Sequence, residues 1–306
     1  MHERVTVLSL ADIQIRDPFV LTVPHEGAYY LFGSTDADIW RPPATGFDCY
    51  RSTDLETWEG PLPAFRPPAG FWSDRNYWAP EVHVHGGRYV MFATFTAEGV
   101  RRGTQILAAD APAGPYLPWS DGPVTPRDWE CLDGTLHVDA DGLPWIVFCH
   151  EWVQVTDGEV VAQRLSDDLR TTAGEPHVLF HASEAPWARR VDHPRVPPEV
   201  DAYVTDGPFL HRTQDGALLM LWSSFGDSGY AMGIARSESG RVEGPWRQEE
   251  TPIWAADGGH GMIARTLHGG LLLTLHQPNT TPLERAVFRR LREVDGTVVL
   301  DEDVAG

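Results

Sequence analysis

One pattern recurs five times along this chain of 306 residues: a polar or acidic residue, a short apolar run, a turn containing glycine, and a second apolar run. The five copies begin at Asp17, Glu81, Asp133, Asp206 and His260. Asp-Gly and Gly-Gly pairs at several of the turns supply the positive φ that two-residue hairpin turns need. Each copy therefore predicts a β-hairpin, and the recurrence is typical of a repeat fold.

Further apolar runs follow the hairpins, for example at residues 106–109 and 230–235. Each unit of roughly 50 to 70 residues then holds three or four strands, which is the size of one propeller blade. The sequence therefore predicts an all-β fold, a single five-bladed β-propeller domain over residues 1–306. A β-sandwich with coincidental turns is the alternative, but a sandwich gives no reason for the pattern to restart at a carboxylate.

Charge and composition exclude several kinds of partner and site. The net charge is -20 and positive charge is nowhere clustered, so nucleic acid and anionic membranes are poor partners. The three cysteines lack Cys-x-x-Cys spacing, which argues against a disulfide framework or a zinc knuckle. No basic N-terminal segment followed by a long apolar run is present, and we therefore expect a cytoplasmic enzyme.

In a propeller the first strand of each blade lines the central channel, so the five starting residues should converge on one funnel. Four acids and a histidine around a pocket would be a costly structural choice, because like charges repel and each desolvated charge is expensive. Glycoside hydrolysis needs such a cluster, since one carboxyl group protonates the leaving oxygen while a carboxylate activates water or attacks the sugar. A third carboxylate can raise the pKa of the acid.

The chain resembles glycoside hydrolase family 43 over nearly its whole length, in motifs at and around the five repeat starts. The phrases that carry the resemblance are Arg16-Asp17-Pro18, Trp78-Ala79-Pro80-Glu81, Leu132-Asp133-Gly134, Thr205-Asp206-Gly207-Pro208, Gly258-Gly259-His260-Gly261-Met262 and His276-Gln277-Pro278-Asn279 with Glu284-Arg285. The resemblance implies a five-bladed propeller that cleaves with inversion, using one base, one acid and one carboxylate that tunes the acid.

By that resemblance Asp17 is the general base, Asp133 tunes the acid and orients the substrate, and Asp206 is the general acid. His260 would lie at the channel axis, where family members often hold a metal ion or water. The resemblance implies a structural Ca²⁺, another ion or a water at the channel axis near His260, with no cofactor needed for the chemistry. Arg285 would point at the substrate.

Several assignments within the site stay open. Asp206 stands where the family usually has glutamate, and Glu151 is a rival for the acid. Glu81 belongs to the same ring of strand starts and is expected to contact the substrate. Either Trp78 or Trp222, but not both, should stack on a sugar.

We predict an exo-acting inverting hydrolase of short oligosaccharides. The family's common activities place α-L-arabinofuranosides first, ahead of β-D-xylosides and β-D-galactofuranosides. A non-catalytic carbohydrate-binding propeller and a related propeller glycosidase, one that uses a histidine as its acid, are the alternatives. The oligomeric state is open.

Overall fold

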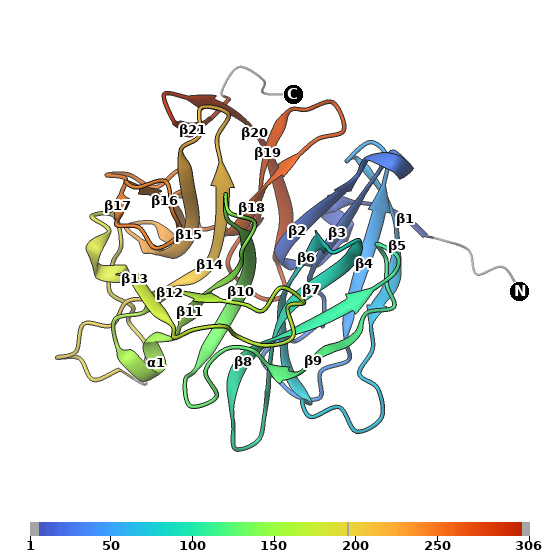
Figure 1. Ribbon diagram of the computed structural model, residues 1–306, viewed down its shortest axis with the longest axis horizontal. Helices are drawn as coiled ribbons and strands as arrows, with labels where there is room; N and C mark the ends of the chain where they lie inside the picture. The colour runs from blue at the N-terminus through green and yellow to red at the C-terminus, as the bar shows by residue number, and fades with distance from the viewer. Residues whose placement is uncertain (1–5, 195, 302–306) are drawn as a thin grey trace, which may run out of the picture.

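In the computed structural model, residues 6–194 and 196–301 are described, and they form five antiparallel sheets around a common axis (Figure 1). The sheets follow one another in chain order as the blades of a propeller. The all-β, five-bladed prediction is confirmed, and the sandwich is ruled out because the described residues form five sheets around one axis instead of two facing layers.

The blades are built from the following strands. Blade one contains β1 (Thr6–Ser9), β2 (Arg16–Val23), β3 (Ala28–Ser34), β4 (Phe47–Ser52) and β5 (Thr57–Phe65). Blade two contains β6 (Arg75–His85), β7 (Arg88–Ala97), β8 (Val100–Ala109) and β9 (Leu117–Pro123). Blade three contains β10 (Cys131–Val138), β11 (Pro144–His150), β12 (Glu159–Arg164) and β13 (His177–His181).

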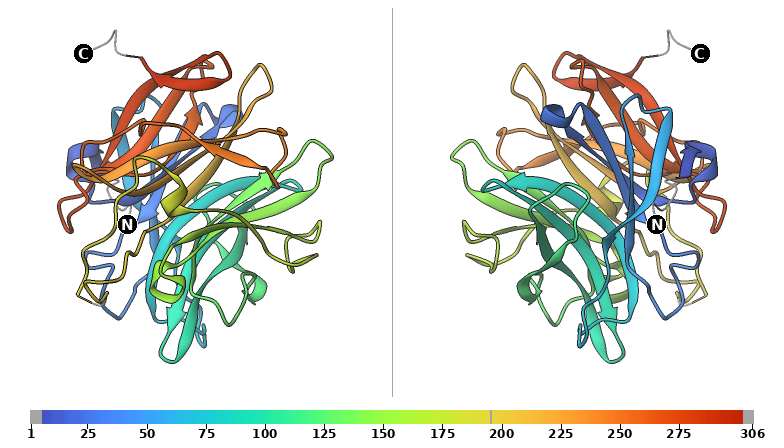
Figure 2. Two further views of the ribbon diagram at one scale, coloured as in Figure 1. Left: turned by 90° about the vertical axis from the view of Figure 1, so that its left-hand side faces the viewer. Right: turned by 90° about the vertical axis from the view of Figure 1, so that its right-hand side faces the viewer.

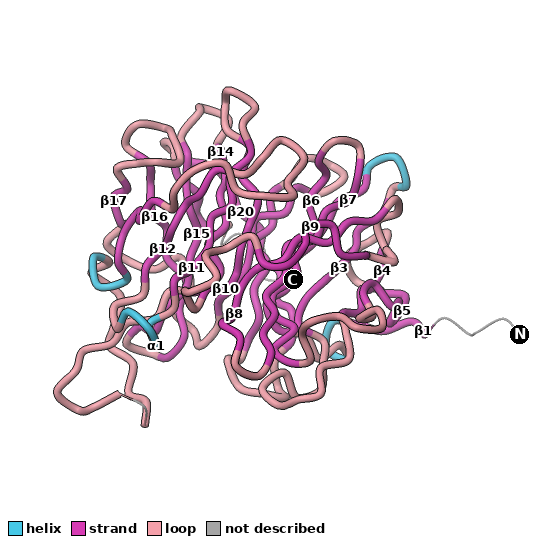
Figure 3. The backbone as a smooth tube through the Cα atoms, turned by 60° about the horizontal axis from the view of Figure 1, so that its bottom comes forward, coloured by secondary structure: helices cyan, strands magenta, loops and turns pink. Residues whose placement is uncertain are grey.

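Blade four contains β14 (Asp206–Arg212), β15 (Leu218–Gly226), β16 (Gly229–Ser237) and β17 (Trp246–Gln248), and blade five contains β18 (Gly259–Arg265), β19 (Leu271–Gln277), β20 (Arg285–Val294) and β21 (Thr297–Leu300). The helices of the described residues are short: η1 (Leu10–Asp12), η2 (Pro24–Glu26), α1 (Trp152–Val155) and η3 (Ala182–Glu184). They lie at the edges of the strand body (Figure 3). None of these helices has the length and apolar character needed to cross a membrane.

The core lies between neighbouring blades rather than inside any one of them. The second strand of a blade is covered by a neighbour on each face, and β3 and β11 accordingly have no exposed residue. One aromatic cluster shows the arrangement, with Phe47 and Phe65 of blade one packed on Tyr77 and Phe95 of blade two. Strands that are buried on both faces have to read as apolar runs, which is why the repeat is visible in the sequence.

The innermost strand of every blade carries a β-bulge at the same position. The register of the ladder shifts between Arg16 and Phe19, Trp78 and Glu81, Leu132 and Thr135, Asp206 and Phe209, and Gly259 and Met262. The residue after the first of each pair has positive φ: Asp17 (55°), Ala79 (45°), Asp133 (57°), Gly207 (50°) and His260 (45°). Bulges re-aim side chains, and positive φ in residues other than glycine is typical of functional sites.

This common bulge corrects the alignment expected from sequence. Ala79, not Glu81, is the blade-two residue equivalent to Asp17, and Glu81 lies two positions further along β6. In blade four the equivalent position is Gly207, so Asp206 lies one residue earlier. The five residues that begin the sequence repeats therefore occupy three different positions relative to the bulge. The apolar pattern alone did not distinguish these positions.

The ring closes where blades one and five meet side by side (Figure 2). The two blades share no strand, since β1 pairs with β5 and β21 pairs with β20. Hydrogen bonds join them instead: the backbone N–H of Ile15 donates to the Glu284 carbonyl, and Arg16 donates to the Glu284 carboxylate at 3.1 Å. Closure thus brings the start of β2 against β19 and the entry to β20.

Candidate active site

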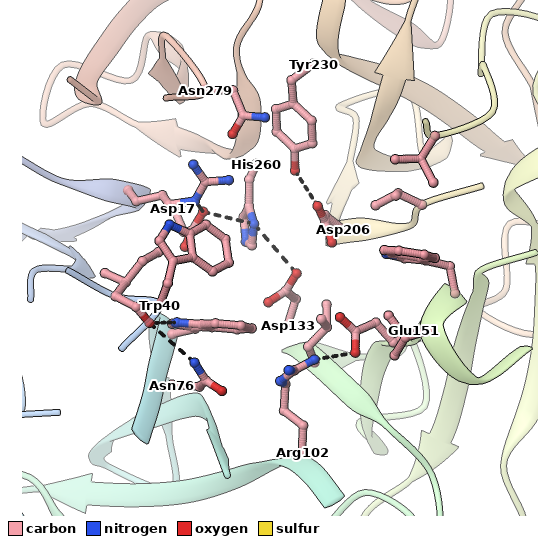
Figure 4. Close-up of a pocket in the computed structure, with 18 of the residues that line it drawn as sticks. Asp17, Trp40, Asn76, Arg102, Asp133, Glu151, Asp206, Tyr230, His260 and Asn279 are labelled. Atoms are coloured by element: carbon pink, nitrogen blue, oxygen red, sulfur yellow. Dashed lines mark hydrogen bonds and ion pairs between the residues drawn. The ribbon is translucent and has the colours of Figure 1, made fainter. Parts of the chain in front are cut away.

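A cavity of about 690 Å³ lies where the five blades converge (Figure 4). Each of the five innermost strands contributes to its lining, with Asp17 from β2, Trp78 from β6, Asp133 from β10, Asp206 from β14 and His260 from β18. The three predicted catalytic acids therefore line one pocket, and each comes from a different blade.

Asp17 is held by donors and positive charge. Its Oδ2 accepts a hydrogen bond of 2.8 Å from the Ser34 hydroxyl, and its Oδ1 lies 3.2 Å from Nδ1 of His260 and 3.7 Å from Nε of Arg16. Burial by itself would raise the pKa of Asp17, but His260, Arg16, His276 and the hydrogen bond from Ser34 together outweigh burial and hold the pKa below its ordinary value. Asp17 is therefore ionised near neutral pH, as a general base has to be.

His276 supports the same residue from the neighbouring blade. Burial lowers the pKa of His276 to about 3, so its ring is neutral near pH 7. Its Nδ1 accepts a hydrogen bond of 3.2 Å from the backbone N–H of Asp17. This contact fixes the backbone of Asp17 at its positive φ.

Asp133 lies between the other two acids. Its Oδ2 is 3.6 Å from Nδ1 of His260, the same atom that contacts Asp17, and it accepts a hydrogen bond of 3.1 Å from the backbone N–H of Gly207, next to Asp206. Burial, followed by the charge of Asp17, raises the pKa of Asp133 well above its ordinary value. Asp133 is therefore coupled to both neighbours.

Asp206 has the electrostatics of a proton donor. Burial, followed by the charge of Asp133, raises the pKa of Asp206 to about 7, although His260 and a hydrogen bond from Tyr230 act in the opposite direction. A carboxyl group with this pKa carries its proton at mildly acidic pH and can release it to a leaving group. The pocket thus combines an ionised carboxylate with a protonated one.

Trp78 and Glu151 also line the pocket, as the sequence predicted, and one arginine joins them. The guanidinium of Arg102 lies 4.6 Å from the centre of the Trp78 ring and donates to Glu151. Trp40 packs edge-on against Trp78 with ring centres 5.2 Å apart. Trp40 and Arg102 were not predicted from sequence, because they belong to a loop and to a third strand that show no repeated motif.

Three predicted substrate contacts are not among the described residues that line this pocket. Trp222 is fully buried on β15, between Trp187 and Phe180, so no face is open to a sugar. Arg285 donates to backbone carbonyls, including that of Ala11 at 2.7 Å. Glu81, two positions beyond the bulge residue, accepts from the Thr135 hydroxyl and contacts His83. Their positions within the blades direct these side chains away from the funnel.

A metal site beside His260 is not supported by the side chains around it. In the described chain, no group of three or more His, Cys, Asp or Glu could hold a metal ion. Nδ1 of His260 faces the carboxylates of Asp17 and Asp133, whereas Ca²⁺ takes six to eight oxygen ligands. These residues do not fit the expected ion.

An open funnel on a five-bladed propeller, with one ionised carboxylate and a second carboxyl group of raised pKa, defines the site of a glycoside hydrolase. The model of "Glycosyl hydrolases family 43" matches residues 11–294. The chain belongs to this family of glycoside hydrolases, which confirms the resemblance and the prediction of a hydrolase. A carbohydrate substrate follows from the family.

Solved and curated relatives agree with the family. The structure of an endo-arabinase from Bacteroides thetaiotaomicron VPI-5482 superposes with a TM-score of 0.87 at 41% identity, covering 96% of this chain and 99% of that one. An extracellular exo-α-(1→5)-L-arabinofuranosidase of Cellvibrio japonicus (strain Ueda107) is 25% identical over 254 residues, which are 76% of this chain and 66% of that enzyme.

An extracellular endo-α-(1→5)-L-arabinanase of Bacillus subtilis (strain 168) is 23% identical over 145 residues, which are 43% of this chain and 45% of that enzyme. The chain thus spans between about half and two thirds of the length of these two curated relatives. Their names contradict the expectation of a cytoplasmic enzyme, because both are named as extracellular. That expectation rested on N-terminal composition, which does not define a compartment.

Proposed function

We propose that this chain hydrolyses α-L-arabinofuranosidic bonds with inversion, using Asp17 as general base and Asp206 as general acid. The observation that carries the proposal is the pair of opposite pKa directions within one pocket, below the ordinary value for Asp17 and about 7 for Asp206. Two titratable groups whose environments separate their pKa values are the usual mark of an acid and a base. The arabinose-acting relatives support the choice of sugar.

The proposed reaction is a single displacement. Asp17 takes a proton from a water molecule as the water oxygen attacks the anomeric carbon, and Asp206 gives its proton to the departing glycosidic oxygen. The bond from the anomeric carbon to that oxygen breaks as the new bond to water forms, so the configuration inverts. We predict carboxyl groups about 6.5 to 9.5 Å apart, the separation that leaves room for the water.

Asp133 acts through its neighbour in this scheme. Its carboxyl group lies beside Asp206 and is bonded to the backbone N–H of Gly207. Its proximity adds to burial in raising the pKa of Asp206, which favours the protonated form of that acid. Residues 1–306 are proposed to act as one catalytic domain, since the five blades close a single ring around this pocket.

Glu151 is the rival proton donor, and its contacts argue against that role. It accepts a charge-assisted hydrogen bond from Arg102, and such bonds favour the ionised carboxylate. We therefore propose that Glu151 binds the substrate together with Trp78. Asp206, which faces acidic neighbours and a tyrosine hydroxyl, is the better donor.

Leaving-group dependence separates the two carboxyl groups. Asp206→Ala should lower kcat on an arabinobiose by roughly 10²- to 10⁴-fold and cost far less on a dinitrophenyl arabinofuranoside, whose leaving group barely needs a proton. Glu151→Ala is the matched control and should slow both substrates alike. The reverse pattern would move the acid to Glu151.

The mode of attack is tested on the products. The sequence predicted release from chain ends, and the relatives carry both endo and exo names. An exo enzyme releases arabinose as its first product from linear α-1,5-arabino-oligosaccharides, whereas early oligomers of mixed length would contradict the exo prediction. An NMR spectrum of the first-formed anomer tests inversion in the same samples.

A further inference from the structure

The hydroxyl of Tyr230, on β16, points at the proposed proton donor (Figure 4). It donates a hydrogen bond of 2.9 Å to Oδ2 of Asp206, and the tyrosine is 1% exposed. In the sequence this tyrosine is marked only as the first residue of an apolar run, residues 230–235. The contact joins two strands of blade four, and both residues line the pocket.

The ring of Tyr230 is held in place from several sides. It stacks on His276 of blade five with ring centres 5.7 Å apart and an angle of 18°, and it meets the edge of Phe225. A Cβ added to Gly259 would lie 2.7 Å from Cε1 of Tyr230, so glycine is needed there for the ring to fit. The hydroxyl therefore has little freedom to leave Asp206.

The chemistry of this pair fixes the place of a proton. Burial, followed by the charge of Asp206, raises the pKa of Tyr230 well above its ordinary value, so the phenol keeps its hydrogen at any working pH. A neutral carboxyl group has one hydrogen and two oxygens. Because Oδ2 accepts from Tyr230, the transferable hydrogen of Asp206 is directed to Oδ1.

We propose that Tyr230 is a positioning residue that orients the carboxyl group of Asp206 and places its transferable proton on Oδ1. This inference rests on the proposed function of Asp206 as general acid. A short aspartate, with one methylene less than glutamate, has few rotamers to explore, and a fixed donor selects one of them.

The hydrogen bond also sets the protonation range of the acid. The titratable and charged groups that interact with Asp206 are Asp133 of β10, His260 of β18, Arg16 of β2, Cys149 of β11 and Tyr230 of β16. Tyr230 stabilises the ionised form and lowers the pKa of Asp206, while burial and Asp133 raise it. Removing the phenol hydroxyl therefore raises the pKa of Asp206 further.

The test is Tyr230→Phe, followed through the pH profile of kcat with two leaving groups. We expect the alkaline limb to move up by on the order of one pH unit, the size of effect that a hydrogen bond to a carboxylate gives. The kcat on arabinobiose should fall about tenfold or more, with a smaller loss on the dinitrophenyl substrate. An unshifted alkaline limb, or equal losses on both substrates, would overturn the proposal.

Tyr116→Phe is the matched control. Tyr116 is also fully buried and donates to a backbone carbonyl, that of Pro112 at 2.7 Å, but it does not line the pocket. The Tyr116→Phe variant loses a buried hydroxyl, so its stability should fall while neither limb of the pH profile of kcat moves. A limb that moves equally in both variants would reduce Tyr230 to a structural role and refute the inference.

A second variant covers the case in which Tyr230→Phe does not fold. Replacing Tyr230 by 3,5-difluorotyrosine keeps the hydrogen bond and makes the phenol a stronger donor, so the alkaline limb should move down instead of up. An unchanged limb would again refute the role of the hydroxyl. The Asp206→Ala experiment tests the acid separately. If Asp206→Ala shows no selective loss on arabinobiose, Asp206 is not the general acid. If it shows that loss while the Tyr230 variants leave the alkaline limb unshifted, only the role proposed for Tyr230 is refuted.

Discussion

Asp206→Asn is expected to stabilise the folded chain at neutral and alkaline pH, because an amide replaces a buried charge. The carboxyl group ionises at the ordinary value of 3.8 in the unfolded chain and at about 7 in the folded chain. Between these values the folded state binds more protons, so the stability of the unaltered chain falls as pH rises through this window and then levels off. The asparagine variant lacks that loss.

The size of the effect follows from the same two values. About three pH units, at about 1.36 kcal/mol each, give a gain of about 4 kcal/mol for the variant above pH 7 and almost none below pH 4. The amide oxygen can still accept the hydrogen bond from Tyr230, so packing is preserved. The measurement is the free energy of unfolding in urea for both chains at pH 4, 6 and 8.

Asp17→Asn is the matched control with the opposite sign. The pKa of Asp17 is lowered in the folded chain, so its charge contributes stability that is present above its unfolded pKa and is lost as pH falls through the folded pKa. This variant should be less stable than the unaltered chain at pH 8. Equal stability changes for the two variants, or no dependence of the Asp206→Asn gain on pH, would refute the electrostatic account of the site.

Three further outcomes are expected. Asp17→Asn should lower kcat by roughly 10²- to 10⁴-fold while calorimetry still detects binding of an arabino-oligosaccharide, and near-normal turnover would exclude Asp17 as the base. The pH profile of kcat/KM should show an alkaline limb near pH 7 from Asp206 and an acid limb below 3.8 from Asp17, so an optimum above pH 8 would contradict both roles. Trp78→Ala should raise KM with little change in Tm, whereas Trp222→Ala should cost about 3–5 kcal/mol of stability by opening a core cavity, and the opposite pattern would reverse their placement.

The fold and two of the acids could be predicted from local sequence. Hairpins with glycine turns and apolar strands repeat because every blade faces the same packing problem, so five copies of one pattern predict five blades. Asp17 and Asp133 follow from this directly, since each takes the positive-φ position of the bulge in its blade. Glu81 was misplaced because a bulge adds one residue to a strand, and no apolar pattern shows where it occurs.

Some contacts that give the acids their roles lie within one blade, such as those of Ser34 with Asp17 and of Tyr230 with Asp206. Others cross between blades, such as the contacts of His260 with Asp17 and Asp133. Ser34 comes from the second strand of its blade, and Arg102 and Tyr230 come from third strands, so none of them belongs to the innermost strands whose starts the repeat marks. Trp78 and Trp222 looked equivalent in sequence, yet one lines the funnel and the other fills the space between blades three and four. Local sequence thus determined the strands, the turns and, among the five bulge positions, Asp17, Asp133 and His260. The tertiary structure decided which carboxyl group is ionised, because a pKa depends on burial and on charges brought together from all five blades.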